Sequence, residues 1–393
     1  MRALPAFTPL VALQTLRFKF LAFFRFSCVN VCIALIMFTM RTFKLRTLSG
    51  NVMKAVVLQG FGNPEMLKIQ EIETPQPGPE EVLVAVRAGG ICHHDVMHRA
   101  GKLPGAKTNV VLGHETAGEI VDVGAAVTTR RKGDRVVVYQ RRFCGTCRNC
   151  LRGRQDMCRA TGLPGVDTEG GYAEYVAVPA AATFTIPDNL DWAAAALASC
   201  PIGTSVRALR GVAGINPGDI VLITGASGGL GVHQIQLVRA FGGRSIAVTT
   251  SPDKAERLRE LGADEVVVAP DLAYSAEVWR LTGKQGVDIA IENVGATLPE
   301  TLRCMTQGGI VVVLGNIGAA NVTTTPGLLI GRRLRIAGSG SATFEDLRQA
   351  LALLASGAVK PIIAANLKFS DAARGHALMD QKALAGRVLM QGW

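Results

Sequence analysis

Four cysteines in one polar loop are the clearest chemical signal in the sequence. They are spaced C-x2-C-x2-C-x7-C in the segment "FCGTCRNCLRGRQDMC", which begins at Phe143. Four thiolates complete a tetrahedral shell around Zn²⁺ and leave no open position, as in a structural zinc site. Because the loop is too polar to form a core of its own, we predict a structural zinc site at Cys144, Cys147, Cys150 and Cys158. Free thiols or disulfides are the alternative.

A catalytic zinc ion needs a different arrangement, and three other segments offer it. Such an ion takes three protein ligands and keeps one position for the substrate. "GGICHHD" supplies Cys92, "LGHETAG" supplies His114 with Glu115 beside it, and "LASCPIG" supplies Cys200. Each residue is ambiguous by itself, since a single cysteine in an alanine-rich helix is more often part of the core.

A glycine-rich segment between a predicted strand and a predicted helix is suited to a dinucleotide. In "VLITGASGGLGVHQ" the spacing is G-x-x-G-G-x-G. Glycine lets the backbone approach a pyrophosphate closely, and the helix N-terminus offers it unpaired N–H groups. A tight turn without a ligand is the alternative. We predict cofactor contacts at Gly225, Ser227, Gly228, Gly229, Leu230 and Gly231.

The end of the next strand bears on the choice between NAD and NADP. An acidic residue there usually binds the ribose 2′-hydroxyl of NAD. The chain instead reads "VTTSPDK", with no acid before Asp253. Hydroxyl groups and a nearby lysine can accept a 2′-phosphate, so we favour NADP(H) over NAD(H), with contacts at Thr249, Thr250, Ser251 and Lys254.

Two patterns of secondary structure are expected to position these groups. From Met53, short alternating strands separated by Pro/Gly turns predict a compact β-rich domain. From about Asp191 a helical stretch is followed by six short apolar strand candidates that alternate with amphipathic helices. Strands that are apolar on both faces fit a parallel sheet covered by helices. The predicted fold class is therefore α/β, with a β-rich domain and a doubly wound parallel sheet.

The positive charge of the chain is concentrated in its first 52 residues. They contain seven basic side chains and no acid, and removing them takes the formal net charge from +11 to +4. That balance is ordinary, and no nucleic-acid-binding module is recognisable.

Six of the nine cysteines fall at metal-ligand positions, which favours a reducing, cytoplasmic location over disulfide bonding. Cys304 is expected to be a buried helix residue.

Residues 1–52 raise a separate question. Their longest uncharged apolar run, from Phe26 to Met40, has 15 residues. A membrane span needs roughly 20. The arginine-rich, acid-free composition is typical of an organelle targeting peptide. We favour translation starting at Met53, with a mitochondrial targeting segment or a membrane anchor as the alternatives.

Five motifs, in this order, resemble the zinc-containing medium-chain dehydrogenase/reductase family and its alcohol dehydrogenases in particular. They are "GxCHxD", "GHExxG", the four-cysteine loop, a cysteine before the cofactor domain, and the glycine loop. The resemblance runs from Met53 to Trp393. It implies a GroES-like catalytic domain at 53–201, a Rossmann NAD(P)-binding domain at 202–340, and a return of 341–393 to the catalytic domain. It also implies a homodimer or homotetramer.

The same resemblance implies roles for individual residues. The catalytic zinc ligands would be Cys92, His114 and Cys200. Glu115 is similar to a neighbouring carboxylate that can approach the metal. Asp95 is similar to the acid that orients the ligand histidine and so fixes its tautomer.

Position 94 departs from the family pattern. Alcohol dehydrogenases usually have Ser or Thr there, whose hydroxyl passes the substrate proton outward, whereas this chain has His94. Met97 stands where a relay histidine is often found, with His98 one place further on. The imidazole of His94 can itself take a proton, since its pKa is close to operating pH. The alternative is that His94 only lines the pocket.

We therefore expect a zinc-dependent alcohol dehydrogenase that moves hydride between a small-molecule alcohol and NAD(P)⁺, with zinc as a Lewis acid at the substrate oxygen. "GASGGLG", "TTSPDK" and the tail from Gly338 also resemble NADPH-dependent reductases of activated C=C bonds, such as acryloyl-CoA and quinone reductases. A non-catalytic protein that binds zinc and nucleotide is a third alternative. No nucleic-acid partner is expected, and no membrane partner unless residues 1–52 are part of the protein.

Overall fold

The computed structural model describes residues 52–160, 162–382 and 384–393. The predictions made for residues 1–51 lie outside these ranges. Val52, the last residue of the segment 1–52 considered above, is described and is the first residue of a strand. None of the helices in the described ranges is long and apolar enough to cross a membrane.

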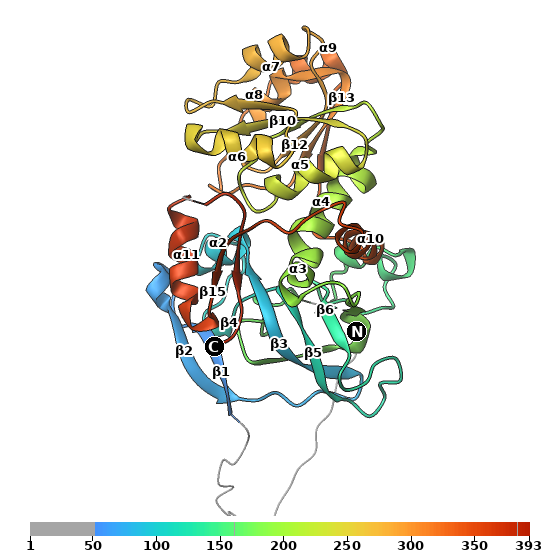
Figure 1. Ribbon diagram of the computed structural model, residues 1–393, viewed down its shortest axis with the longest axis vertical. Coiled ribbons are helices and arrows are strands. Elements are labelled where there is room, and N and C mark those ends of the chain that lie inside the picture. The colour runs from blue at the N-terminus through green and yellow to red at the C-terminus, as the bar shows by residue number, and fades with distance from the viewer. Residues whose placement is uncertain (1–51, 161, 383) are drawn as a thin grey trace, which may run out of the picture. The chain divides into compact units, whose positions relative to one another are not determined.

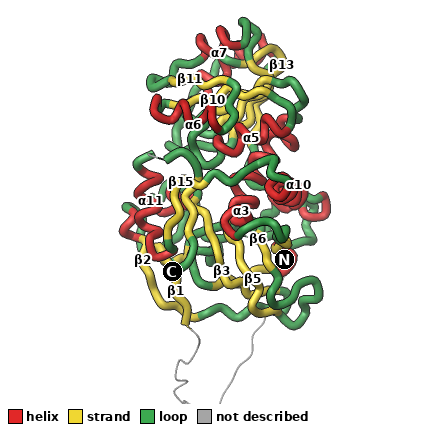
Figure 2. The backbone as a smooth tube through the Cα atoms, in the orientation of Figure 1, coloured by secondary structure: helices red, strands yellow, loops and turns green. Residues whose placement is uncertain are grey.

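The first part of the chain forms the predicted β-rich domain, whose strands are mostly antiparallel (Figures 1 and 2). A three-stranded sheet has the order β2-β1-β4, and a seven-stranded sheet has the order β15-β16-β3-β5-β6-β8, with β7 pairing to β3. The strands are β1 (Val52–Leu58), β2 (Leu67–Glu73), β3 (Glu81–Ile91), β4 (Val110–Val111), β5 (Glu115–Val123), β6 (Arg135–Val138), β7 (Tyr175–Pro179), β8 (Thr183–Thr185), β15 (Ile363–Leu367) and β16 (Arg387–Met390).

Two of these strands come from the C-terminal end of the chain. β16 pairs antiparallel with β3, with Leu389 opposite Gly90, and β15 pairs parallel with β16. The buried side chains of β16, among them Val388 and Met390, join the hydrophobic core of the β-rich domain. The C-terminal segment thus returns to the first domain and can reach the residues at the ends of β3 and β5.

The six predicted apolar strands form one parallel sheet with the order β11-β10-β9-β12-β13-β14. They are β9 (Ile220–Ile223), β10 (Arg244–Thr249), β11 (Glu265–Val268), β12 (Val287–Glu292), β13 (Met305–Val313) and β14 (Arg335–Gly338). Counted along the chain this is the order 3-2-1-4-5-6 of a Rossmann fold, in which a dinucleotide binds where the order reverses. That reversal lies between β9 and β12, and the glycine loop follows β9.

Helices cover both faces of this sheet (Figure 1). Alternate strand residues enter two different cores: Ile223 belongs to the core that contains the helix residue Ile235, whereas Leu222 belongs to the core that contains Val278. This explains why the strands are apolar throughout. The helices are α5 (Gly231–Ala240), α6 (Ala255–Glu260), α7 (Ser275–Leu281), α8 (Leu298–Arg303) and α9 (Pro326–Arg332). Cys304 lies fully buried directly after α8.

The alanine-rich stretch after Asp191 is helical as predicted, but its helix is not regular. α3 (Trp192–Leu197) is capped by the Asp191 carboxylate, which accepts from the Ala194 N–H at 2.7 Å. A π-helical turn, Ala198–Ile202, follows and contains Pro201. Proline cannot donate the usual backbone hydrogen bond, and π turns inside helices are frequent at functional sites. Cys200 lies in this turn, between α3 and α4 (Gly203–Val206).

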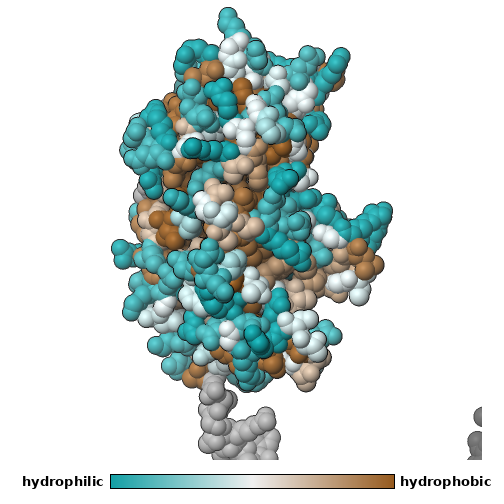
Figure 3. Space-filling view, turned by 45° about the vertical axis from the view of Figure 1, so that its right-hand side comes forward, coloured by the Kyte–Doolittle hydropathy of each residue, from teal (hydrophilic) through white to brown (hydrophobic). Residues whose placement is uncertain are grey.

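Three further helices complete the β-rich domain. α2 (His93–Arg99) begins directly after Cys92. α10 (Phe344–Ala355) starts with a capping box between Thr343 and Asp346, and α11 (Ala372–Asp380) packs against α2. The buried Arg99 guanidinium pairs with Asp380 at 2.8 Å across that contact. Polar side chains cover most of the surface in Figure 3, with apolar ones scattered among them.

Candidate active site and structural metal site

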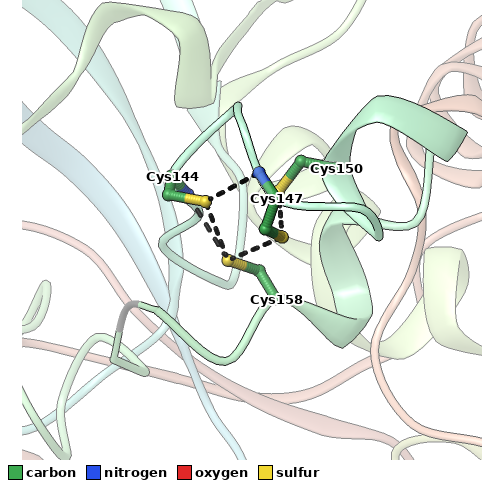
Figure 4. Close-up of side chains that lie close together, drawn as sticks. All are labelled: Cys144, Cys147, Cys150 and Cys158. Atoms are coloured by element: carbon green, nitrogen blue, oxygen red, sulfur yellow. Dashed lines mark hydrogen bonds between the residues drawn. The ribbon is translucent and has the colours of Figure 1, made fainter.

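The four predicted cysteines of the polar loop lie together (Figure 4). The Sγ–Sγ distances are 3.5 Å for Cys147–Cys150, 3.9 Å for Cys147–Cys158 and 3.7 Å for Cys144–Cys158. A tetrahedron with Zn–S bonds of about 2.3 Å has edges of about 3.8 Å. The sulfur positions therefore fit one tetrahedral zinc ion.

The electrostatics of the loop also fit a cation. Backbone N–H groups of Thr146 and Cys147 lower the pKa of Cys144 to about 6, which favours its thiolate. Burial, and then the Cys147 thiol, raise the pKa of Cys150 to about 12. Four thiols this close cannot all ionise without a compensating charge, and a divalent metal ion supplies one.

The residues predicted for the catalytic metal also converge. Cys92 directly follows β3, His114 directly precedes Glu115 at the start of β5, and Cys200 lies in the π turn. One ligand atom from each nevertheless lies within 4.8 Å of the others. The Sγ atoms of Cys92 and Cys200 are 4.0 Å apart. A hydrogen bond with Cys200 lowers the pKa of Cys92 well below that of a free thiol, against the opposing effect of burial. Two thiols and one imidazole match the donor set of a catalytic zinc site.

Asp95 connects two of these residues. Its Oδ2 accepts the Cys92 N–H at 2.9 Å, and its Oδ1 lies 3.2 Å from His114 Nδ1. Burial opposes protonation of His114, but the Asp95 carboxylate outweighs it and raises the pKa of His114 to about 10. A metal ion bound by this ring would take the place of that proton.

Glu115 is paired with an arginine that the sequence reasoning missed. Arg387, the first residue of β16, donates from Nε to Glu115 Oε2 at 3.0 Å, and its Nη2 pairs with Oε1. The same Nη2 lies 3.8 Å from Cys200 Sγ. A Cβ on Gly229 would lie 2.6 Å from Arg387 Nη1, so the guanidinium also borders the glycine loop. The one feature of the sequence that could have indicated this role is an arginine at the start of an otherwise apolar strand, "RVLM".

The three neighbouring histidines have different surroundings. The His94 and His114 rings are 5.6 Å apart, and His94 Nδ1 has no hydrogen-bond partner in the described part of the chain. Burial, and then the charge on His114, lower the pKa of His94. His98 is fully buried, with Nε2 2.8 Å from the Lys107 carbonyl, so it serves the local structure. His93 Nε2 lies 3.4 Å from the carbonyl of Ile317, which follows β13.

The glycine loop makes a tight turn. It joins β9 to α5, and Gly225 has a φ of 57°, which favours glycine. A Cβ on Gly231 would lie only 2.5 Å from the backbone of Ala226. Leu230 is the N-cap residue of α5, and the Ser227 carbonyl accepts the Gly386 N–H at 3.0 Å. Gly228 is exposed at the tip of the loop.

The residues at the end of β10 divide into two groups. Thr249 is buried and its Oγ1 accepts the Ser251 N–H at 3.2 Å, while Lys254 is almost buried and donates from Nζ to the Lys382 carbonyl at 2.6 Å. Thr250 is exposed and Ser251 half-buried. Within the segment 249–252 no acidic side chain is present. Thr250 and Ser251 are therefore the accessible hydroxyls at the position that would meet a ribose.

Comparison with known proteins agrees with this architecture. The alcohol dehydrogenase GroES-like domain matches residues 78–188, and the zinc-binding dehydrogenase domain matches residues 229–356. The chain therefore belongs to the zinc-type medium-chain dehydrogenase/reductase family, and it is an oxidoreductase of that family.

Individual relatives point to two reaction types. An acryloyl-coenzyme A reductase of Metallosphaera sedula is 32% identical over 86% of this chain and 99% of its own length. A NAD-dependent alcohol dehydrogenase of Saccharolobus solfataricus is 33% identical over 86% of this chain and 100% of its own. The crystal structure of AibC superposes with a TM-score of 0.82 at 39% identity, covering 88% of this chain and 97% of that one.

Proposed function

We propose that this protein is a zinc-dependent, NADP(H)-linked dehydrogenase that interconverts an alcohol and its aldehyde or ketone. The observation that carries the proposal is the convergence of Cys92, His114 and Cys200, from three distant segments, within 4.8 Å. The set of two thiols and one imidazole is that of a catalytic zinc site with a position for substrate. Bound zinc would supply a Lewis acid that polarises a substrate oxygen, and bound nicotinamide would supply or take the hydride.

The chain's own residues would prepare this chemistry. Asp95 fixes the ring of His114, so that the other ring nitrogen is presented as a ligand. Arg387 neutralises Glu115, and its charge lies between the metal ligands and the glycine loop. An anionic pyrophosphate at that loop would meet both the α5 N-terminus and this guanidinium.

The proton released from an alcohol would need an acceptor near the metal ligands. The residue in that position is His94, whose ring lies edge-on to His114 and whose lowered pKa keeps it neutral at pH 7. A neutral imidazole can accept a proton, which a protonated one cannot. We assign His94 the role of proton acceptor, in place of the hydroxyl that alcohol dehydrogenases usually have.

A second candidate function is the NADPH-dependent reduction of an activated C=C bond. It is favoured by the similarity to the acryloyl-coenzyme A reductase and by the histidine at position 94 where a hydroxyl would be usual. In that reaction hydride goes to a β-carbon, and His94 would return a proton instead of taking one. The complete set of zinc ligands favours the alcohol reaction.

A substrate panel separates the two functions. Full-length protein is assayed for NADP⁺ reduction with alcohols, and for NADPH oxidation with aldehydes, acryloyl-CoA, crotonyl-CoA and quinones. We expect turnover with alcohols and aldehydes, and its loss in Cys92→Ala and His114→Ala while NADP(H) still binds. Cys304→Ala, which removes a buried thiol outside the site, is the matched control. Full activity of both ligand variants would exclude the zinc mechanism, and turnover of acryloyl-CoA alone would establish the second function.

Assembly and location are part of the same proposal. We propose a homodimer or homotetramer in the cytoplasm. β14 is the outer strand of the parallel sheet, and Ile336 in it and Ile330 in the neighbouring α9 are 41% and 76% exposed. Cys92, Cys200 and Cys304 are free thiols, which suits a reducing compartment. Light scattering on the purified protein gives the oligomeric state.

A further inference from the structure

Tyr172 is a buried residue next to the catalytic cluster that the proposed function does not use. Its side chain is only 1% exposed, and its hydroxyl donates to Asp95 Oδ2 at 3.0 Å. We propose that Tyr172 is a positioning residue of the catalytic metal site, acting through Asp95 on the ligand His114. This inference rests on the proposed function only in treating that cluster as a metal site.

Asp95 can transmit an effect of Tyr172 because it contacts both sides of the cluster. One carboxylate oxygen accepts two hydrogen bonds, from the Cys92 N–H and the Tyr172 hydroxyl, and the other faces His114 Nδ1. The two donors fix the plane of the carboxylate, which in turn fixes the direction of the oxygen that faces His114. Such outer partners of a ligand histidine set its orientation and tautomer.

Tyr172 is also connected, through the backbone, to the segment directly before His114. The Tyr172 N–H donates to the Leu112 carbonyl at 2.9 Å, and the Gly171 N–H donates to the Gly113 carbonyl at 2.9 Å. Gly113, directly before the ligand, has a φ of 99°, and a Cβ there would lie 2.4 Å from the Tyr172 ring. The ring thus packs on the turn that presents His114, while its hydroxyl holds the carboxylate opposite the imidazole.

The hydroxyl of Tyr172 acts only as a donor. Burial, and then the Asp95 carboxylate, raise its pKa well above the usual range, so it keeps its proton. A buried carboxylate that loses one of its donors is poorly satisfied and moves more freely. Removal of the hydroxyl alone should therefore loosen His114 without changing the packing of the ring.

The test measures metal affinity, not turnover. Zinc release from the full-length protein is followed with a chromogenic chelator, and the step that belongs to the catalytic cluster is identified by its absence in Cys92→Ala. We expect Tyr172→Phe to lower the zinc affinity of the catalytic cluster by about tenfold. This is the low end of the effects seen when an outer partner of a metal ligand is removed. The release from Cys144, Cys147, Cys150 and Cys158 should be unchanged and is the internal control. Tyr175→Phe, with a half-buried ring three residues away, is the matched variant.

A second comparison separates positioning from general destabilisation. If Tyr172 acts through Asp95, the Tyr172→Phe change should have little further effect in an Asp95→Asn background. An unchanged affinity in Tyr172→Phe, an equal loss at both metal sites, or full additivity with Asp95→Asn would each overturn the inference. Because zinc release is measured without substrate, these results stand whether or not the substrate panel shows alcohol turnover.

Discussion

Arg387 and Glu115, 272 positions apart in the chain, form an ion pair in which the side chains are 3% and 0% exposed. The pair joins the start of β16 to the start of β5, beside Cys200 and the glycine loop. Two opposite charges buried together compensate each other, whereas a single buried charge without its partner strongly destabilises the folded protein. The C-terminal return is therefore fixed at the site by charge as well as by strand pairing.

Replacement of Arg387 tests how much this pair matters to stability. Arg387→Leu should lower the free energy of unfolding by about 3–5 kcal/mol, because it leaves Glu115 charged and unpaired in the interior. Urea unfolding followed by fluorescence measures the change. Arg87→Leu, which breaks the exposed Arg87–Glu119 pair, should change it by less than about 1 kcal/mol. Equal effects of the two variants would show that the buried pair has no special role.

The sequence could predict the parts of this fold that depend on local patterns. The six apolar strands, the glycine loop and the cysteine quartet each lie within one short segment, so spacing and hydrophobicity reveal them. The Arg387–Glu115 pair could not be found in that way, since nothing near Arg387 in the sequence is acidic. The same holds for the hydroxyl of Tyr172, whose partner Asp95 is 77 positions away.

Two local details of the site also differ from a simple sequence reading. The helical stretch that carries Cys200 contains a π turn at Pro201, which depends on packing as well as on propensity. Lys254, predicted to meet a 2′-phosphate, already donates to the Lys382 carbonyl. An ammonium group has three donors, so Lys254 can still bind a phosphate, but its position is set by the C-terminal segment.

Gly231→Ala tests the close approach of the glycine loop to α5. The new Cβ would lie 2.5 Å from the Ala226 backbone, which cannot move as a flexible side chain would. We expect a loss of about 1–3 kcal/mol in stability and weaker NADP(H) binding. Gly331→Ala in α9, where a Cβ meets nothing within 4 Å, should instead stabilise by about 0.5–1 kcal/mol. Thermal unfolding and fluorescence titration with NADPH measure both, and an unaffected Gly231→Ala would contradict the predicted contact.

His233 should make stability depend on pH. It is fully buried in α5, with Nδ1 2.8 Å from the Gly229 carbonyl and Nε2 accepting the Ile362 N–H at 3.0 Å. Those two bonds require a neutral ring, and burial lowers its pKa from 6.5 to about 4. The unfolded chain therefore takes up a proton between pH 6.5 and 4 that the folded one does not, so stability is full above this window and falls as pH drops through it.

The size of this effect can be isolated by a variant. The stability advantage of the wild type over His233→Gln should shrink by about 3 kcal/mol between pH 7 and pH 4. Urea midpoints at several pH values give the difference. His376 is also buried, with a pKa lowered to about 4. It contributes equally to the pH dependence of stability in the wild type and in the variant, so its contribution cancels in their difference. A difference that is constant with pH would show that His233 is not held neutral.

Loss of one thiol from the cysteine loop should affect stability but not the catalytic metal site. Cys147→Ser removes a sulfur that lies 3.5 Å from Cys150 and 3.9 Å from Cys158, so the tetrahedral set is incomplete. Metal analysis should then find one zinc ion per chain fewer than in the wild type, with faster thermal inactivation and nearly normal initial activity. Retention of the full zinc content would mean that this loop is not a metal site.

Thr250→Asp tests the choice of cofactor. Thr250 is exposed at the end of β10, where an acidic side chain would bind the ribose hydroxyls of NAD and repel the 2′-phosphate of NADP. A repulsion of about 1.4 kcal/mol already changes affinity tenfold, so we expect at least about a tenfold shift in kcat/KM from NADP(H) towards NAD(H). Thr128→Asp, at an exposed position in the β-rich domain, adds the same charge elsewhere and should leave the ratio unchanged. If the wild type already prefers NAD(H), the hydroxyls at 250 and 251 do not select for a 2′-phosphate.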